Sequence, residues 1–168
     1  LRHIRICEHL DYKNLVISLK ASDVPLMIEA YSLLAEKVDY PFHLGVTEAG
    51  LLRDGTVKSA IGIGSLLYAG IGDTIRVSLT DDPAEEVKTG RSILSALGLR
   101  HFGPTIISCP TCGRTQVELI HLAKEVETAL ADIDAPLKVA VMGCVVNGPG
   151  EAREADFGIA GGAGSGII

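Results

Sequence analysis

The sequence predicts an α/β fold built around parallel β-sheet, and three observations favour it. Short runs of β-branched and other apolar residues alternate with segments whose apolar residues recur at helical spacing. Most of these runs are apolar throughout, which is typical of parallel strands that are covered on both faces. Successive runs begin about 30 residues apart, which is the length of one βα unit.

Six of the apolar runs are predicted to be strands, the last of them on a weaker pattern than the others. They are Leu15–Leu19, Phe42–Val46, Thr74–Leu79, Thr105–Ser108, Leu137–Met142 and Phe157–Ala160. A glycine-rich run over residues 158–166 overlaps the last of them. This run lacks the Lys-Ser/Thr ending and the following helix of a phosphate-binding loop, so it favours a turn or a strand edge.

Two predicted helices begin at recognisable N-terminal caps. Ser22 or Asp23 precedes a segment with apolar residues at helical spacing and with Pro25 in its first turn. Asp82 and Pro83 begin another helix, whose first turn is acidic, as the helix dipole favours.

Three further helices are expected from other signals. Thr115 and Glu118 have the spacing of a capping box and predict a helix that begins beside them. The segment Val57–Gly70 is also predicted to be helical, although its glycines weaken the pattern. Cys7 lies alone on a predicted helix near the start of the chain, and we expect a structural role for it.

The composition restricts the classes of function. Hydrophobic residues make up 47% of the chain and charged residues 21%, which excludes a disordered protein. The net charge is −6 and Lys and Arg do not cluster, so we expect no nucleic-acid or membrane partner. The longest uncharged stretch, Ser59–Gly72, is shorter than the roughly 20 residues that a membrane span needs. No secretory leader opens the chain, so we expect a cytoplasmic protein.

The chain is expected to contain two domains and to be part of a longer protein. The segment Gly98–Pro104 has no apolar periodicity and predicts a short linker between residues 1–100 and residues 101–168. The sequence also begins at Leu1 rather than at Met, and already within its pattern of elements.

Three of the four cysteines form the first candidate site. Cys109 and Cys112 have the spacing C-x-x-C, and Cys144 opens the sequence C-V-V-N-G-P-G-E. Both groups follow a predicted strand, at the edge where parallel sheets place their sites. Three thiolates would fill three positions around a metal centre, which leaves Cys7, a histidine, a carboxylate, water or substrate as the fourth ligand.

Several interpretations of these cysteines remain open. A thioredoxin-like redox pair of Cys109 and Cys112 leaves Cys144 and its glycine-rich loop unexplained. A structural zinc site, as in a non-catalytic assembly module, would need four Cys or His ligands, and no histidine lies near Cys144. Buried cysteines acting as small apolar residues are a further alternative. An iron–sulfur cluster held by three cysteines and one different ligand is favoured.

Polar residues at the ends of the first three strands form the second candidate site. Lys20 follows the first strand, Glu48 follows the second, and Arg76 and Ser78 lie two residues apart within the third. In a barrel such groups face a common mouth, where two cations and a hydroxyl would bind phosphate and Glu48 would handle a proton or bind a hydroxyl. Each residue alone also fits a solvated loop, but Arg76 within an apolar strand would be costly to bury unpaired. The five histidines lack metal-ligand spacing. His43 lies on a predicted strand and could face the barrel mouth or the helices, and a structural role is favoured.

Five motifs in one order make the chain similar to a known enzyme family. They are Leu19–Asp23, Gly45–Gly50, Ile75–Thr80, Cys109–Arg114 and Asn147–Glu151. The chain resembles 4-hydroxy-3-methylbut-2-enyl diphosphate synthase through nearly its whole length. The resemblance implies an oxidoreductase of the non-mevalonate isoprenoid pathway that contains a 4Fe–4S cluster. It would open and dehydrate 2-C-methyl-D-erythritol 2,4-cyclodiphosphate to 4-hydroxy-3-methylbut-2-enyl diphosphate, with electrons from ferredoxin or flavodoxin.

The resemblance also implies a fold and a set of site residues. The chain would contain about three βα units from the C-terminal part of a TIM barrel, followed by a small α/β iron–sulfur domain truncated at its C-terminus. The family works as a homodimer, and we expect this part alone to be inactive. By position, Cys109, Cys112, Cys144 and Glu151 would hold the cluster, with Glu151 also catalytic. Lys20, Arg76 and Ser78 would bind the substrate's diphosphate, Asn147 would lie beside the substrate, and Glu48 would be a catalytic acidic group.

Overall fold

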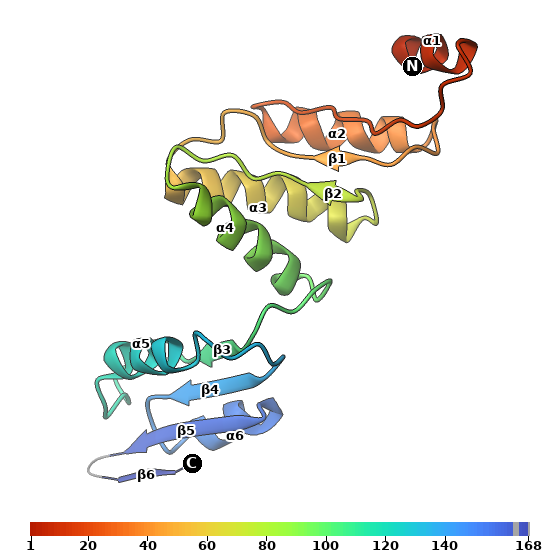
Figure 1. Ribbon diagram of the computed structural model, residues 1–168. Helices are drawn as coiled ribbons and strands as arrows, with labels where there is room; N and C mark the ends of the chain where they lie inside the picture. Colours follow the sequence, from red (N-terminus) through yellow and green to blue (C-terminus); the bar gives the residue numbers. More distant parts are fainter. Residues whose placement is uncertain (163–164, 168) are drawn as a thin grey trace. The chain divides into compact units, whose positions relative to one another are not determined.

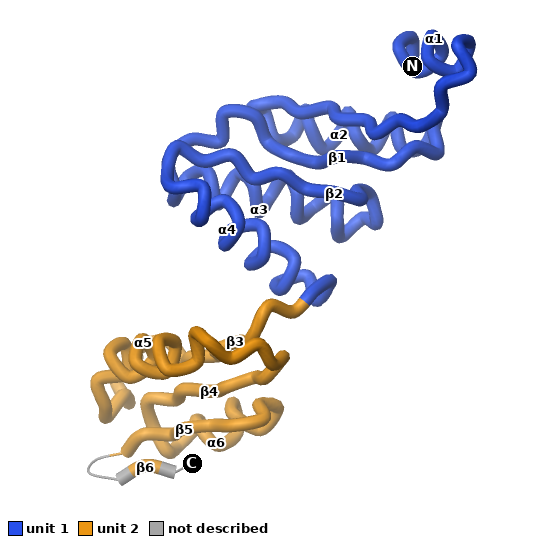
Figure 2. The backbone as a smooth tube through the Cα atoms, viewed as in Figure 1, with its two compact units in different colours: residues 1–100 blue, residues 101–168 orange. Residues whose placement is uncertain are grey.

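Two structural units make up the chain, residues 1–100 and residues 101–168 (Figure 2). The computed structural model describes residues 1–162 and 165–167. Parallel strand pairs joined through helices occur in both units, which confirms the α/β class predicted from the alternating pattern.

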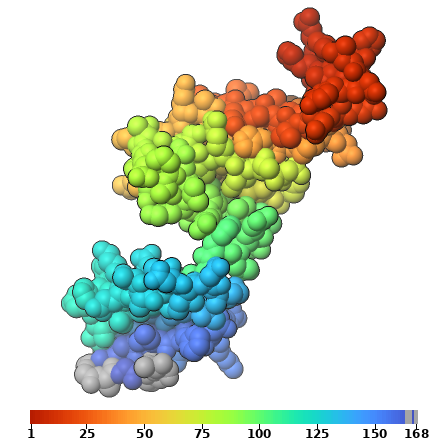
Figure 3. All heavy atoms as spheres, in the orientation of Figure 1, coloured from red at the N-terminus to blue at the C-terminus, as the bar shows by residue number. Residues whose placement is uncertain are grey.

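The first unit contains four helices and two short strands among its described residues. In chain order they are α1 (Arg2–His9), α2 (Val24–Ala35), β1 (His43–Leu44), α3 (Leu52–Tyr68), β2 (Thr74–Ile75) and α4 (Pro83–Ala96). The two strands pair in parallel, with His43 opposite Thr74. Helices α2, α3 and α4 pack side by side in chain order along the strands (Figure 1). Helix α1, red in Figure 3, projects from the rest of this unit.

The core of the first unit lies between the strands and the three helices. Its fully buried members include Leu44 and Val46 from the second predicted strand and Met27, Ile63 and Leu66 from the helices. Because side chains alternate along an extended chain, burying Leu44 and Val46 turns His43 and Gly45 to the opposite side. The candidate residues Lys20 and Arg76 lie on that side, next to Gly45.

The helix caps confirm two of the local predictions. The Asp23 carboxylate accepts a hydrogen bond from the backbone N–H of Leu26 at 2.8 Å. The Asp82 carboxylate accepts one from Ala84 at the same distance. Each satisfies a donor that the first turn of a helix would otherwise leave free.

All three strand predictions in the first unit were wrong in extent. The second predicted strand, Phe42–Val46, is reduced to His43–Leu44. The segment Leu15–Leu19 forms a single parallel bridge, between Ile17 and Phe42, and no ladder. The third predicted strand, Thr74–Leu79, is reduced to Thr74–Ile75, although the N–H of Arg76 still donates to Leu44 O at 2.8 Å. Arg76 and Ser78 therefore follow a strand instead of lying within one.

The second unit contains a four-stranded sheet in the order β3-β4-β5-β6. Its elements are β3 (Thr105–Ser108), α5 (Leu119–Ala129), β4 (Lys138–Met142), α6 (Gly148–Glu151), η1 (Ala152–Glu154), β5 (Phe157–Gly162) and β6 (Ser165–Ile167). The first three strands are parallel, and β6 is antiparallel to β5. The glycine-rich run thus forms strands, except for residues 163–164, which lie outside the described residues.

The predicted capping box before α5 was wrong. Helix α5 begins at Leu119 with Glu118 at the cap position, and no side chain caps it. The Thr115 hydroxyl instead accepts a hydrogen bond from the N–H of Cys112 at 3.1 Å. The threonine therefore stabilises the cysteine loop, which competes with the helix for the same side chain.

No helix in the described part of the chain is long and apolar enough to cross a membrane.

Candidate functional site

Lys20 and Arg76 meet across β1 at Gly45. A Cβ atom placed on Gly45 would lie 3.0 Å from Lys20 Cε and 2.8 Å from the carbonyl oxygen of Arg76. The Lys20 stem therefore crosses the strand at a position where no side chain stands in its way. Partial burial, and then the positive charge of Arg76, lower the pKa of Lys20 below its usual value. The charge of Arg76 acts on Lys20, and two neighbouring cations favour an anion between them.

His43 lies on the same side of β1 as the two cations. Its Nδ1 is 2.8 Å from Thr74 Oγ1 on β2. Burial lowers the pKa of His43, and the charges of Lys20 and Arg76 lower it further. His43 was expected to be structural, with a place at the barrel mouth as the alternative, and its side chain lies on the side of the two cations. Its position two residues before Gly45 indicates this side, because residues two apart on a strand share a face.

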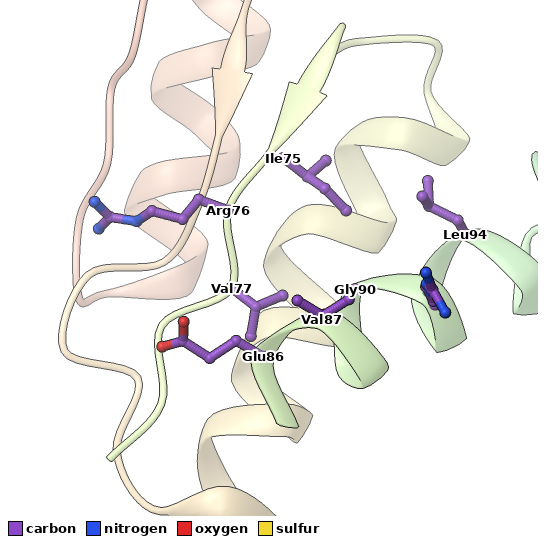
Figure 4. A pocket seen from close by; sticks show the side chains of 8 residues that line it. Ile75, Arg76, Val77, Glu86, Val87, Gly90 and Leu94 are labelled. Carbon is purple, nitrogen blue, oxygen red and sulfur yellow. The ribbon is translucent and has the colours of Figure 1, made fainter. Parts of the chain in front are cut away.

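Arg76 is exposed and directly follows β2, although it was predicted to lie within a strand. Val77, its neighbour, is buried and lines a pocket of about 320 Å³ with Ile75, Val87 and Leu94. Figure 4 shows the guanidinium of Arg76 pointing away from this apolar pocket. The solvent-exposed position removes the cost of burying an unpaired charge, and Arg76 forms no ion pair within residues 1–162 and 165–167.

The positions of Ser78 and Glu48 relative to Lys20 and Arg76 are less closely defined. Ser78 is half-buried and follows Arg76 by two residues, so the extended segment keeps both on one side. Glu48 is exposed and has a φ of 55°, a left-handed conformation that is uncommon outside glycine. Its carboxylate forms no ion pair with Lys20 or Arg76 among the described residues. Backbone strain of this kind is often found at functional sites.

The three cysteines of the second unit follow adjacent parallel strands. Cys109 comes directly after β3, and Cys144 comes two residues after β4. Because Ser108 is opposite Val141 in the register, the two strands end at the same edge of the sheet. The N–H of Gly143 donates a hydrogen bond to Cys109 Sγ at 3.2 Å.

The surroundings of two of these thiols favour the thiolate form. A backbone hydrogen bond from Arg114 lowers the pKa of Cys112, and the Arg114 and Thr115 side chains assist it. The N–H groups of Asn147, Val146 and Gly148 lower the pKa of Cys144, which a nearby charge on Cys112 would raise. Thiolates are the form that binds metals, and N–H donors to sulfur are typical of iron–sulfur sites. The donor set thus fits an iron–sulfur cluster in its chemistry.

The complete ligand set is not assembled. Asn147 occupies the cap position of α6 and Glu151 ends this helix, and both side chains are exposed. No group of three or more His, Cys, Asp or Glu side chains in the described part of the chain is arranged to hold a metal ion. Cys7 lies half-buried on α1, in the first unit.

Comparison with known proteins gives matches over both units. A family model described as the GcpE TIM-barrel domain matches residues 1–91, and one described as the GcpE protein C-terminal domain matches residues 105–168. Similar proteins occur in Caldanaerobacter subterraneus subsp. tengcongensis (66% identical), Geobacter sulfurreducens (63%) and Clostridium perfringens (62%). Each is named 4-hydroxy-3-methylbut-2-en-1-yl diphosphate synthase (flavodoxin), and each alignment covers all of this chain.

The chain spans about half the length of these curated relatives, namely 47%, 48% and 48% of the three proteins. The model of the barrel domain alone matches more than half of the chain, since it covers residues 1–91 of 168. These matches confirm the resemblance drawn from the five motifs. The chain belongs to the GcpE family, whose curated members similar to it are named as 4-hydroxy-3-methylbut-2-en-1-yl diphosphate synthases.

Proposed function

We propose that this chain is the substrate-binding and iron–sulfur portion of a 4-hydroxy-3-methylbut-2-enyl diphosphate synthase. The enzyme would open the ring of 2-C-methyl-D-erythritol 2,4-cyclodiphosphate and remove one hydroxyl group as water, in a reaction that consumes two electrons. The observation that carries the proposal is the cysteine edge of the second unit, where two thiols have lowered pKa values and the third accepts an N–H hydrogen bond. The names of the relatives support the same reaction.

Residues 1–100 would act as part of a TIM-barrel domain that binds the diphosphate of the substrate. Lys20 and Arg76 supply the positive charge, and Ser78 adds a hydroxyl donor on the same side. Arg76 is suited to grip two phosphate oxygens at once because its guanidinium presents paired N–H donors and has no acidic partner among the described residues. The contact of Lys20 with Gly45 brings its ammonium toward Arg76, so both could contact one diphosphate.

Residues 101–168 would act as the 4Fe–4S domain. Cys109, Cys112 and Cys144 are proposed as thiolate ligands and Glu151 as the fourth ligand. A 4Fe–4S cluster would supply electrons and, at the carboxylate-bound iron, a Lewis-acid position. Glu151 suits that position because an oxygen ligand holds iron less tightly than a thiolate does. Asn147, exposed at the start of α6, would contact the substrate beside this position.

Glu48 is proposed as the acidic group of the barrel that takes part in the chemistry. A hydroxyl group that leaves as water must receive a proton, and an exposed carboxyl near the strand ends can position or deliver it. Its left-handed backbone conformation holds the side chain at a fixed place in the loop after β1.

We propose flavodoxin as the electron donor, because the relatives carry that word in their names, with ferredoxin as the alternative. We also propose a homodimer, as the family resemblance implies.

The proposal is tested by anaerobic turnover of the cyclodiphosphate with reduced flavodoxin, using a protein extended to the length of its relatives. Formation of 4-hydroxy-3-methylbut-2-enyl diphosphate is expected, together with loss of turnover in Cys112→Ser. The 168-residue chain alone is expected to be inactive, because part of the barrel would be missing. A colourless protein that contains zinc and no iron after reconstitution would indicate an assembly module instead. Reversible oxidation confined to Cys109 and Cys112 would indicate a thioredoxin-like pair.

A further inference from the structure

The hydroxyl group of Tyr31 lies within the backbone pairing that precedes Lys20. Tyr31 comes from α2 and is fully buried, with its ring edge-on to Phe42 at a centroid distance of 5.7 Å. Its oxygen donates a hydrogen bond to His43 O at 2.7 Å and accepts one from Leu19 N at 2.8 Å. The hydroxyl therefore connects two backbone groups that belong to neighbouring extended segments.

The position of this hydroxyl is that of a missing ladder bond. Ile17 N donates to Pro41 O at 2.9 Å, and Ile17 O accepts from His43 N at 2.8 Å, as in a parallel pair. The next bond of a parallel ladder would join Leu19 N directly to His43 O. The Tyr31 hydroxyl occupies that place, and Ser18 Oγ beside it also donates to His43 O, at 3.0 Å, so side-chain oxygens separate the two backbones. This insertion explains why the predicted strand Leu15–Leu19 ends after a single bridge.

Backbone hydrogen bonding between the two extended segments resumes immediately after Lys20. Thr47 N donates to Ala21 O at 3.0 Å, so the chain is fixed on both sides of the lysine. Between these two fixed points the Lys20 stem lies against Gly45, where a Cβ atom would stand 3.0 Å from Lys20 Cε. The backbone before Lys20 and the space beside it are thus both determined by residues that do not themselves contact an anion.

We propose that Tyr31 and Gly45 are positioning residues for Lys20. Tyr31 holds the backbone before Lys20 one oxygen atom away from β1, and Gly45 leaves room for the lysine stem to reach toward Arg76. This inference rests on the proposed function, in which Lys20 and Arg76 together bind a diphosphate. Phenylalanine at position 31 would keep the ring and remove the bridge, so Leu19 N would either pair directly with His43 O or lose its partner. Either result moves Lys20 relative to Arg76.

The first test measures the pKa of Lys20 by NMR and needs no activity assay. Lysines labelled with ¹³C at Cε are titrated by NMR, and Lys20 is assigned with Lys20→Arg. Burial and the charge of Arg76 lower the pKa of Lys20, while the neighbouring His43 is uncharged in the pH range where a lysine titrates. In Tyr31→Phe the pKa of Lys20 is expected to rise toward the usual value of lysine. Tyr40→Phe is the matched control, because its hydroxyl bonds only to the exposed Glu8 carboxylate.

The second test separates the positioning role from the proposed function. In the protein extended to the length of its relatives, Tyr31→Phe is expected to raise KM for the cyclodiphosphate about 10-fold, the loss of roughly one charge-assisted contact, with kcat little changed. If Lys20→Ala raises KM and Tyr31→Phe changes neither KM nor the Lys20 pKa, the positioning role is wrong. If the Lys20 pKa shifts in Tyr31→Phe while Lys20→Ala leaves KM unchanged, the positioning role stands and the diphosphate function is wrong.

Gly45→Ala keeps the proposal testable if Tyr31→Phe does not fold. The added methyl group would meet both the Lys20 stem and the backbone carbonyl oxygen of Arg76, and it leaves the Tyr31 hydroxyl in place. It therefore changes the spacing of Lys20 and Arg76 by a second route, and the same rises in Lys20 pKa and KM are expected. Gly64→Ala is its control, because a Cβ there would meet only Ile93 at 4.0 Å. An unchanged Lys20 pKa and an unchanged KM in folded Gly45→Ala would overturn the proposal.

Discussion

Replacing Arg76 with alanine is expected to weaken binding of the substrate diphosphate and to leave folding stability unchanged. The guanidinium is exposed and forms no ion pair within the described residues, so its removal breaks no internal contact of that kind. Stability effects at such exposed positions are usually within about 0.5 kcal/mol. We therefore expect the substitution to lower the affinity for the substrate and not the stability of the fold.

The size of that loss follows from the contacts Arg76 would make. Two charge-assisted hydrogen bonds to phosphate would contribute roughly 1.5–3 kcal/mol each where water is excluded. The exposure of Arg76 reduces this contribution. We expect a net loss of about 2 kcal/mol, or about a 30-fold rise in Kd.

The assay is binding and turnover of the cyclodiphosphate by the protein extended to the length of its relatives. KM should rise with Kd while kcat changes little, because the contact is present in both the bound substrate and the transition state. Arg53→Ala, on the exposed surface of α3, is the matched control. A Kd within twofold of the unchanged protein, or a fall in unfolding free energy of about 2 kcal/mol, would refute the reasoning.

Three further predictions concern the remaining site residues. Glu48→Gln keeps the shape of the side chain and removes its charge, so turnover should collapse while substrate binding is retained; normal turnover would exclude a catalytic role. Cys7→Ser should leave the iron content unchanged and Glu151→Ala should lower it; the reverse pattern would make Cys7 the fourth ligand. The lowered pKa of His43 means that the unfolded chain binds its proton more readily, so stability should fall as pH falls below about 6.5. The free energy of unfolding of His43→Gln, measured in urea, should not show the part of this fall that His43 contributes. An equal fall in the variant would assign the pH dependence to other groups.

The starts of α2 and α4 were predictable because their signals are local. Asp23 and Asp82 each accept a hydrogen bond from a backbone N–H two or three residues further along, so the chain segment itself contains the information. The helix predicted over Val57–Gly70, which has no cap signal, spans Leu52–Tyr68. The prediction of a capping box at Thr115 was wrong for a non-local reason. Its hydroxyl has a competing partner in the cysteine loop, and only the folded loop reveals which partner is chosen.

The extent of the strands and the position of His43 were harder to predict. The strand Leu15–Leu19 is cut short by a hydroxyl from α2, and hydrophobic periodicity contains no sign of this insertion. By contrast, the presence of Lys20 and Arg76 on one side of β1 was predictable, because residues near the ends of successive parallel strands converge. The exposure of Arg76 was not, since it depends on where β2 ends.

Iron and acid-labile sulfide analysis of the 168-residue chain, after anaerobic reconstitution, tests the central claim most directly. The chain is expected to bind about four iron and four sulfide ions with a brown visible absorption, as a 4Fe–4S cluster requires. Cys144→Ser should lose most of this iron and Cys7→Ser should keep it. A colourless chain that takes up zinc and no iron, or equal iron binding by Cys144→Ser, would contradict the assignment of Cys109, Cys112 and Cys144 as cluster ligands.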